Sequence, residues 1–553
     1  MLHSKKILPV SSYIPFEVRK IKRPNLLWSN RISGESEDQL LDKYAYCAPL
    51  DGEPEDTYTS EGKIAHIERY GGSGIGVNGG GVRCGMFDGM TVKGIGKSQL
   101  AGTTAPFWHS YGGASIKEAI REVIWGEVFD SALPFGAVRV EAIIATGTSV
   151  PLRYVDAYGN NSCSRALILR KPFIRPAHYM RASFFQPSSK FSSTYLSDSE
   201  RTQVALSTIF DALRSSLNIL SINDFYFLLR TAFLRYASQI AIARAKRLIH
   251  GSISSSNITL DGRILDFGMT SSVSDFGRII IARGCPDATQ QHHGIINTLV
   301  ELGYYLNRYN PQLIKSRKNW QRDIREHFMC EYENAFRIQL IKLSGFPESA
   351  IEALSFIEKL NFSNILIEII SEGNCEPFKI LSPCDKYKPS MPDTMGKYNL
   401  RSILIKASEL ADSSTADEAL KPLIFDNSLR ERFIKEYFNI YSIVRNFMQA
   451  NDKEIRIFIK LNAKRINSDL SSLYSFNLNN KIDAEISEGK SVGKFIDKII
   501  SKIIFRVKDL ENDTIYFKYD GEIIKANPLL GILRSGQAIN PNDYLEFSKN
   551  IDF

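Results

Sequence analysis

The sequence predicts an α+β protein of two lobes, with an N-terminal extension before them and a mostly helical C-terminal region after them. Eight glycines between positions 71 and 85, among short β-prone segments, indicate a first lobe of strands and tight turns. A largely apolar run over 223–249 predicts a long buried helix and hence a helical second lobe. The segment 250–268 then places an Asp-Gly pair between apolar residues, which predicts a β-hairpin.

The length of 553 residues exceeds what one average core can organise, so we expect several domains or lobes. The expected division is an N-terminal extension at 1–60, a glycine-rich lobe at 61–180, a helical lobe at 181–395 and a C-terminal region at 396–553. A Pro- and Lys-containing loop at 383–393 is interpreted as the last boundary.

Composition narrows the class of protein. Hydrophobic residues at 43% and charged residues at 24% are ordinary for a globular chain, and a net charge of +8 over this length does not indicate a nucleic-acid partner. The seven cysteines contain no C-x-x-C pair, which argues against a disulfide framework or a zinc site. The N-terminus does not resemble a signal peptide, and no long apolar run follows, so we expect a cytoplasmic protein without membrane insertion.

The first lobe is expected to contain strands at 75–77, 90–93, 138–144 and 166–169 and a helix at 115–129. Ser115 and Glu118 form a capping-box pattern at the start of that helix. The expected later helices, of which the first is capped by Asn223 or Asp224, are 223–249, 290–308, 318–343, 348–371, 402–411, 428–450, 452–475 and 491–505, with a late hairpin near 514–525.

The glycine-rich turns are candidates for binding phosphate. Glycine lets backbone amides approach an anion closely, so Gly79 and Gly81 are candidate nucleotide contacts. Lys93, on the strand that follows, is the candidate phosphate-binding cation, and Lys97 and Arg83 compete with it. The structural alternative is a set of hairpin turns with solvated basic residues.

Further charged residues extend this pattern. Glu122, on the predicted helix, would hold the strand lysine in place; the alternative is a surface residue paired with Lys117 or Arg121. Arg170 and Arg175 follow a strand end and present forked donors suited to phosphate oxygens, unless they belong to a basic loop.

The predicted hairpin places Asn257 and Asp266 together at its open end. An amide oxygen and a carboxylate that converge make a site suited to Mg²⁺ and the phosphates it bridges. A surface hairpin with a polar rim is the alternative.

The ordered set of motifs resembles the selenoprotein O family, whose members have a bilobal protein-kinase-like fold, bind ATP in a reversed sense and transfer AMP to proteins. The residues that carry the resemblance are Tyr70-Gly71-Gly72, Val92-Lys93-Gly94-Ile95-Gly96, Ile120-Arg121-Glu122, Pro172-Phe173-Ile174-Arg175, and His250-Gly251 through Asn257 to Asp266-Phe267-Gly268. The resemblance implies ATP and Mg²⁺ as cofactors. It implies phosphate contact by Lys93 with Glu122 as its partner, triphosphate binding by Arg83, Arg170 and Arg175, a nucleotide contact at Gly112, and Mg²⁺ binding by Asn257 and Asp266.

The chain departs from the family pattern at two places. Ser256 stands where the family has the aspartate proposed to accept a proton, and Tyr111-Gly112-Gly113 stands where it has Asp-Gly-Arg. Ser256 has three interpretations: lost activity, a base supplied by Asp261 or Asp275, or an acceptor that needs no base. A carboxylate is such an acceptor, because it is already ionised at neutral pH.

A carboxylate acceptor would yield an acyl-adenylate. This chemistry is similar to that of proteins that mature siderophore-microcins, which attach a siderophore to a peptide's C-terminal carboxylate together with an acyltransferase-like subunit. The expected partners are therefore a protein or peptide acceptor and such a subunit. Two other classes stay open: a catalytically silent nucleotide-binding pseudokinase scaffold, and an ordinary phosphotransferase, which is disfavoured because Ser252 occupies its base position.

Overall fold

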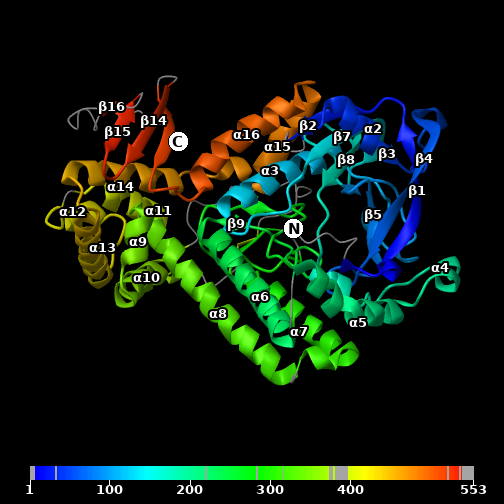
Figure 1. Cartoon of the computed structure of the whole chain (residues 1–553). Helices are drawn as coiled ribbons and strands as arrows, with labels where there is room; N and C mark the ends of the chain where they lie inside the picture. Colours follow the sequence, from blue (N-terminus) through cyan, green and yellow to red (C-terminus); the bar gives the residue numbers. More distant parts are fainter. Residues whose placement is uncertain are drawn as a thin grey trace.

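The computed structural model describes residues 7–30, 34–217, 221–281, 284–314, 317–372, 378–379, 396–410, 412–519, 522–534 and 537–538. Over these residues the chain is a mixed α/β protein. One large antiparallel sheet occupies the first third, and helices make up most of the rest (Figure 1). Short 3-10 helices interrupt the chain at η1 (Val10–Ser12), η2 (Glu55–Thr57), η3 (Phe107–His109), η4 (Pro176–Tyr179), η5 (Pro311–Leu313) and η6 (Ser471–Leu473).

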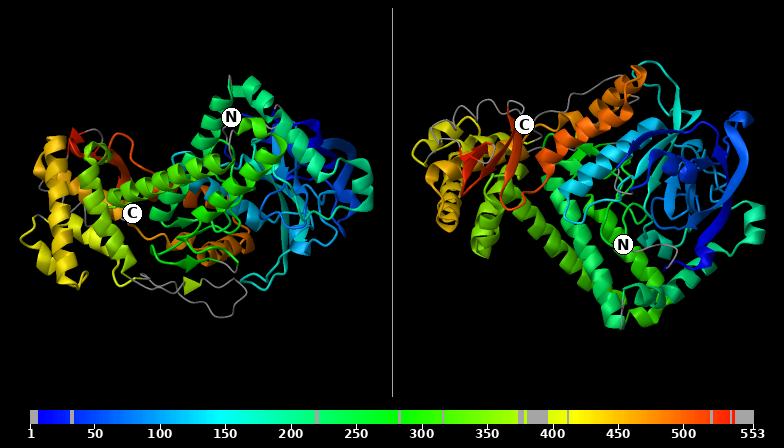
Figure 2. Two further views of the ribbon diagram at one scale, coloured as in Figure 1. Left: turned by 90° about the horizontal axis from the view of Figure 1, so that it is seen from below. Right: turned by 45° about the horizontal axis from the view of Figure 1, so that its top comes forward.

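The large sheet is curled and has the strand order β2-β7-β8-β6-β5-β4-β1-β3, with every neighbouring pair antiparallel (Figure 2). Residues 13–47, expected to belong to an extension, supply three of these strands and the helix α2 (Glu37–Tyr44). The strands are β1 (Tyr13–Ile21), β2 (Asn25–Ser29), β3 (Tyr46–Cys47), β4 (Tyr58–Arg69), β5 (Gly80–Phe87), β6 (Met90–Lys93), β7 (Ala142–Pro151) and β8 (Ser162–Arg170).

The strand predicted at 90–93 is confirmed as β6, whereas the strand predicted at 75–77 is wrong. The residues between β4 and β5 form turns instead. Gly72, Gly74 and Gly76 adopt positive φ angles of 81°, 95° and 62°, so the chain direction changes repeatedly there. The run predicted as a strand over 138–144 enters the sheet only at Ala142.

Helix α3 (Ile116–Ala132) confirms the helix predicted at 115–129. The Ser115 hydroxyl accepts a hydrogen bond from the Glu118 N–H at 3.1 Å, but the predicted capping box is only half formed, because the Glu118 side chain pairs elsewhere. The helix is buried on almost every side, since β8 packs on one face and α16 (Val492–Val507) on another.

Helices and short strands follow the sheet over the described residues between 189 and 379. They are α4 (Ser189–Thr194), α5 (Asp198–Leu217), α6 (Ile222–Ala245), β9 (Leu248–Ile249), β10 (Ser271–Ser272), β11 (Ile279–Ile280), α7 (His292–Tyr309), α8 (Arg317–Lys342), α9 (Glu348–Ala353), α10 (Phe356–Ser371) and β12 (Phe378–Lys379). Helix α6 is capped by Ser221, not by the predicted Asn223 or Asp224. The helix predicted at 348–371 is two helices, because Leu354 is extended and Ser355 caps α10 with a full capping box.

The C-terminal region is mostly helical, as predicted, and ends in a four-stranded antiparallel sheet rather than a lone hairpin. Its elements are α11 (Leu400–Ser408), α12 (Ala416–Leu420), α13 (Asn427–Met448), α14 (Asp452–Ile466), α15 (Ser475–Ser487), α16, β13 (Ile515–Tyr519), β14 (Glu522–Asn527), β15 (Gly531–Arg534) and β16 (Gln537–Ala538). The helix predicted at 452–475 stops at Ile466, because the Asn467 side chain donates to the Ala463 and Leu343 carbonyls. The predicted boundary loop at 383–393 lies outside the described residues.

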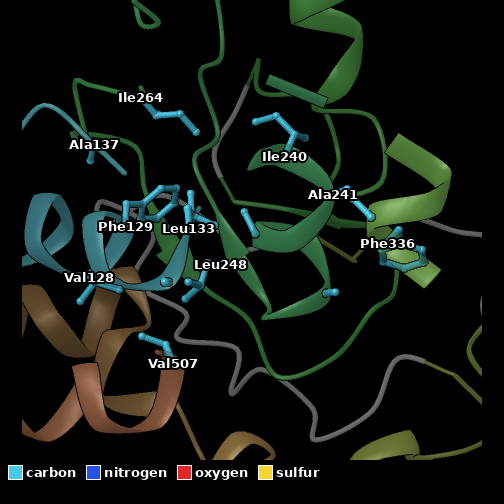
Figure 3. Close-up of a cluster of buried hydrophobic side chains, with 14 of the residues drawn as sticks. Val128, Phe129, Leu133, Ala137, Ile240, Ala241, Leu248, Ile264, Phe336 and Val507 are labelled. Carbon is cyan, nitrogen blue, oxygen red and sulfur yellow. The ribbon is translucent and has the colours of Figure 1, made fainter. Parts of the chain in front are cut away.

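The main core joins the first lobe to the later helices. Figure 3 shows Phe129 of α3, Leu133 just after that helix, Ile240 and Ala241 of α6, and Val507 of α16 in one cluster of buried side chains. Among the helices that the structure describes, none has the length and apolar composition needed to cross a membrane.

The start of α6 can be tested with two substitutions. Ser221→Ala removes the hydroxyl that accepts from the Asp224 N–H and donates to the Asp224 carboxylate, so we expect the free energy of unfolding to fall by about 1 kcal/mol. Asn223→Ala, two residues later on the exposed first turn, serves as the matched control and should change it by less than about 0.5 kcal/mol. Chemical denaturation measures both values, and a larger loss in the Asn223 variant would contradict this capping assignment.

Candidate functional site

A cluster of charged side chains, buried around Lys93 and Glu122, joins the large sheet and α3 to the Asp-Phe-Gly segment. The Lys93 ammonium lies 2.7 Å from Glu118 Oε1, 2.9 Å from Glu122 Oε1 and 3.4 Å from Asp266 Oδ1. Lys93 is 5% exposed and Glu122 is fully buried. The lysine of the first lobe, the glutamate of α3 and the aspartate of the Asp-Phe-Gly motif, which were predicted to act together, therefore meet.

Local structure explains why these side chains converge. Lys93 ends β6 in the middle of the sheet, in register with Cys84 on one side and Ile168 on the other. Glu118 and Glu122 are one helical turn apart on α3 and so share a face, which is turned toward the strand lysine.

The alternative prediction, a surface Glu122 paired with Lys117 or Arg121, is wrong, because Glu122 is buried and pairs with Lys93 and Arg170. Lys117 instead binds Asp156 at 2.8 Å and Asp483 at 2.6 Å.

Two predicted arginines belong to the same cluster. Both terminal nitrogens of the Arg83 guanidinium donate to the Glu118 carboxylate, Nη1 at 2.9 Å and Nη2 at 2.7 Å. Arg170 donates to Glu122 Oε2 at 2.6 Å. Each glutamate is thus shared by two cations, which offsets much of the cost of burying it.

The third predicted arginine, Arg175, is nearby but bound differently. Its guanidinium carbon lies 4.6 Å from the centre of the Tyr70 ring and 4.9 Å from that of Phe173, and its Nε has no hydrogen-bond partner among the described residues. It is a buried cation held by aromatic faces, and the described contacts do not include a carboxylate bond.

The cluster fixes the protonation of its members. The charge of Lys93 lowers the pKa of Asp266 well below its usual range. Burial opposes ionisation of Glu118, but Arg83 and Lys93 outweigh it and lower its pKa to about 2. Burial likewise opposes the charge on Lys93, and the three carboxylates outweigh it, so its pKa is raised. All of these groups are therefore charged at neutral pH.

The hairpin predicted from the Asp-Gly turn is present. Leu265 N–H donates to the Asn257 carbonyl at 3.1 Å, and Ile258 and Ile264 form an antiparallel bridge. Asp266 directly follows Leu265, so Asn257 and Asp266 lie at the open end of the hairpin, as predicted.

The Asp-Phe-Gly segment is held against α3. Asp266 has a φ of +65°, an uncommon conformation for a non-glycine residue. The Phe267 N–H donates to Glu122 Oε2 at 3.1 Å, and its ring packs 5.3 Å from that of Phe129. Glu122 therefore orients both the lysine and the backbone that presents Asp266.

Asn257 and Asp266 are the candidate metal ligands. Among the described residues no group of three or more His, Cys, Asp or Glu side chains is placed to hold a metal ion. Mg²⁺ commonly binds through one or two protein oxygens and completes its shell with water and substrate phosphates. The Asp266 side chain is 47% exposed, so the pair fits a metal that arrives with a nucleotide better than a permanent structural ion.

Ser256 lies beside the candidate metal ligand Asn257, in a serine row made of Ser252, Ser254, Ser255 and Ser256. Its hydroxyl is 2.9 Å from that of Ser254 and donates to Asn257 Oδ1 at 3.4 Å. The Asn257 Nδ2 donates to the Ser252 carbonyl at 2.8 Å, which leaves its Oδ1 turned toward Ser256.

The two aspartates considered as substitute bases are engaged elsewhere. The Asp261 carboxylate accepts from Arg263 at 2.9 Å and from the Thr259 hydroxyl, at the turn end of the hairpin. Asp275 is buried and accepts from the Phe276 N–H at 2.6 Å. Neither contact is directed toward Ser256.

The glycine-rich loop covers the serine row. A Cβ on Gly72 would lie 2.1 Å from the Ser255 hydroxyl, so only glycine permits this approach. The next residue, Ser73, donates its N–H to Glu301 of α7 at 3.1 Å. The loop thus spans from the sheet to the later helices.

The two glycines predicted to contact the nucleotide, Gly79 and Gly81, lie in different backbone settings. The Gly79 N–H donates to the Leu100 carbonyl at 2.9 Å, so that amide is already bonded within the protein. Gly81 lies in β5, where its carbonyl accepts from the Ser98 hydroxyl at 3.3 Å.

Gly112 lies next to the charge cluster. It has a φ of +95°, and a Cβ there would lie 2.2 Å from the Lys97 amide nitrogen. The following carbonyl, of Gly113, accepts from Arg83 at 2.8 Å. Gly112 therefore adjoins a residue that is bonded to a candidate phosphate-binding arginine.

Helix α15 of the C-terminal region holds α3 through polar contacts. Arg121 of α3 donates to the Thr270 carbonyl at 2.8 Å, just after the Asp-Phe-Gly motif, and to Asn479 of α15 at 2.9 Å. Lys117 and Asp483 add an ion pair between the same two helices. Helix α15, which lies in the region 396–553 for which no role could be predicted, thus helps hold the helix that presents Glu122.

Three participants were not predicted. Glu118 was visible one turn before Glu122, but helical spacing does not show which glutamate faces the sheet. Arg121 and Glu301 carry no local signal, because their partners lie far away in the sequence.

A scan against protein-family models and a search of curated proteins both find no match for this chain. Its function is therefore inferred from the geometry of the site.

The pKa of Glu118 predicts an acid-dependent stability. A carboxyl group with a lowered folded-state pKa stabilises the protein above its unfolded pKa, near 4.5, and loses that contribution as the pH falls to about 2. We expect Glu118→Gln to destabilise the protein at neutral pH, and the difference from wild type to narrow by about 3 kcal/mol between pH 6 and pH 2. Denaturation at several pH values measures this.

Glu431→Gln, at an exposed position of α13, is the control and should show little difference from wild type at any pH. A Glu118 difference that stays constant with pH would show that its carboxylate is not ion-paired in solution.

Proposed function

We propose that the protein binds Mg·ATP between its two lobes and transfers AMP to a protein or peptide acceptor. The observation that carries the proposal is the meeting of Lys93, Glu122 and Asp266 in one buried cluster. A strand lysine held by a helix glutamate beside a metal-binding aspartate is the arrangement with which kinase-like enzymes grip a triphosphate.

We further propose that the fold is a divergent bilobal kinase-like one, related to the selenoprotein O family. An antiparallel sheet, the α3 helix packed on it and the Asp-Phe-Gly hairpin in the helical half support this. The resemblance adds the reversed nucleotide orientation and the transfer of AMP rather than phosphate.

Phosphate binding would replace part of the present cluster. Glu118 occupies the fork of Arg83 and one face of Lys93, which are positions that phosphate oxygens would take. Glu118 is 21% exposed, whereas Glu122 is fully buried and fixed by Arg170 and the Phe267 amide. Glu118 is therefore the carboxylate that gives way, and Glu122 keeps Lys93 in place.

Asn257 and Asp266 would hold Mg²⁺, which would bridge phosphate oxygens and neutralise their charge. Gly112 and the loop that covers the serine row would enclose the nucleotide. In the reaction, an acceptor oxygen bonds to the α-phosphorus, the bond from the α-phosphorus to the bridging oxygen breaks, and pyrophosphate leaves.

Ser256 favours an acceptor that is already ionised. Position 256 itself offers a hydroxyl and not a carboxylate to take a proton, and the Asp261 and Asp275 carboxylates are bonded elsewhere. An acceptor carboxylate needs no base and would meet no negative charge at position 256. The product would be an acyl-adenylate, suited to siderophore-peptide (microcin) maturation with an acyltransferase-like partner subunit.

A second candidate is a catalytically silent pseudokinase scaffold that binds nucleotide and presents a partner surface. The observation that favours it is the same serine row, in which hydroxyls bond to one another where a catalytic carboxylate would stand. This candidate shares the nucleotide site and differs only in the chemical step.

The position of the transferred label separates these functions. Incubation with acceptor peptide and ATP radiolabelled at the α-phosphate should label the peptide, whereas ATP labelled at the γ-phosphate should not. Lys93→Met and Asp266→Asn should each reduce α-labelling by at least about a hundredfold, because they remove phosphate and metal contacts.

Arg432→Gln, at an exposed arginine paired with Glu368 on the far helices, is the control and should retain activity. Labelling from the γ-position would contradict AMP transfer. Nucleotide binding without any labelling would favour the scaffold.

The identity of the acceptor group can be tested with two peptides that differ only in the C-terminus. A free carboxylate should accept AMP, detected as a hydroxylamine-sensitive adenylate, and a C-terminal carboxamide should not. Ser256→Asp should lower labelling of the carboxylate peptide, because it adds a like charge beside the acceptor. Equal labelling of both peptides would contradict the acyl-adenylate chemistry.

A further inference from the structure

A cavity of about 670 Å³ lies among the helices of the second half, and its lining shares no residue with the Lys93 cluster. It is bounded by the end of α6, the middle of α8, the end of α10 and the segment 276–278. Its size is in the range of sites that bind small molecules. The charged residues in its lining are Arg244, Arg278, Glu333 and Arg337.

Arg244 is the central cation of this cavity. Its guanidinium carbon lies 4.4 Å from the centre of the Phe336 ring, and its Nη1 donates to the Tyr332 hydroxyl at 3.2 Å. Its Nε is buried, with no hydrogen-bond partner in the described part of the chain. Figure 3 shows Phe336 of α8 beside the end of α6, near Ala241. The contacts described for this guanidinium are with Tyr332 and Phe336, and none of them is an ion pair with a carboxylate.

The other charges leave the cavity positive. Arg337 donates to two neutral groups of α10, the Ser363 hydroxyl at 3.0 Å and Asn364 Oδ1 at 2.6 Å. Arg278 is paired with Asp287 at 3.2 Å. Glu333 is exposed, and in the part of the chain that the structure describes it forms no ion pair with Arg337, one turn away. Two arginines thus line the cavity without an acidic partner.

Most of the remaining wall is apolar or aromatic, with two hydroxyl groups, of Thr289 and Ser371, among it. Its large side chains are those of Phe276, Met329, Tyr332, Phe336, Ile367 and Ile370. A small inorganic anion would satisfy the arginines but would leave this surface uncovered. A flat or branched apolar body attached to a negative group would cover both.

We propose that this cavity binds an organic anion, with its acidic group on Arg244 and Arg337 and an aromatic or branched aliphatic body against Tyr332 and Phe336. The inference does not depend on nucleotide transfer. It assigns a second ligand site to the helices beside the segment that follows Asp266.

Anilinonaphthalenesulfonate, a fluorescent aromatic anion, is a suitable probe, and phenylnaphthylamine is its uncharged counterpart. Titration of the native full-length protein should show saturable sulfonate binding. Arg244→Gln should weaken that binding at least about tenfold, the factor expected for one charge-assisted hydrogen bond, and leave the uncharged dye unaffected. Arg432→Gln, outside the cavity, should bind both dyes as wild type does.

If Arg244→Gln does not fold, as judged by circular dichroism, Arg337→Gln on the same cavity carries the test with the same expectation. Sulfonate binding that is equal in wild type and both cavity variants would overturn the proposal, as would equal loss of both dyes. The dyes report on the cavity without ATP, so failure here leaves nucleotide transfer untouched, and failure of the labelling experiment leaves this site untouched.

Discussion

The ammonium group of Lys93 is the contact on which the arrangement of the two lobes depends. It is almost fully buried, and it keeps its charge only because carboxylates from two separate parts of the chain surround it. Such a network contributes little net stability compared with apolar packing of the same volume. Its presence at a junction between lobes is better explained by a need for charge there, which is the reason to look for an anionic ligand.

Other elements of the structure hold the groups around Lys93 in place. Glu122 faces Lys93 because the sheet and α16 bury α3 between them. Arg121 links the same helix to the backbone after Asp-Phe-Gly and to α15, so the C-terminal region supports the site without lining it. The glycine-rich loop closes from the other side, through the Ser73 amide and Glu301. The charges are thus held by elements distant in sequence.

Much of the site could be predicted because its members have local signatures. Lys93 ends a short β-prone strand, the spacing of α3 is helical, and an Asp-Gly turn aligns Asn257 with Asp266. What could not be predicted depended on long-range packing. Glu118 was not identified as a member of the site, since its partners Arg83 and Lys93 come from the sheet and not from its own helix. The strands of residues 13–47 looked like an extension, because their partners in the sheet come after them in the chain. Ser115 was identified as a cap, but the Glu118 side chain does not complete the capping box, because it pairs with Arg83 and Lys93 instead.

Binding of Mg·ATP is the most direct test of the proposed nucleotide site. Isothermal titration calorimetry on the wild-type chain should show saturable binding that requires Mg²⁺, and binding should be lost in Lys93→Met while the variant remains folded. Equal binding by wild type and the Lys93 variant, or none by wild type, would contradict a triphosphate site at the Lys93 cluster.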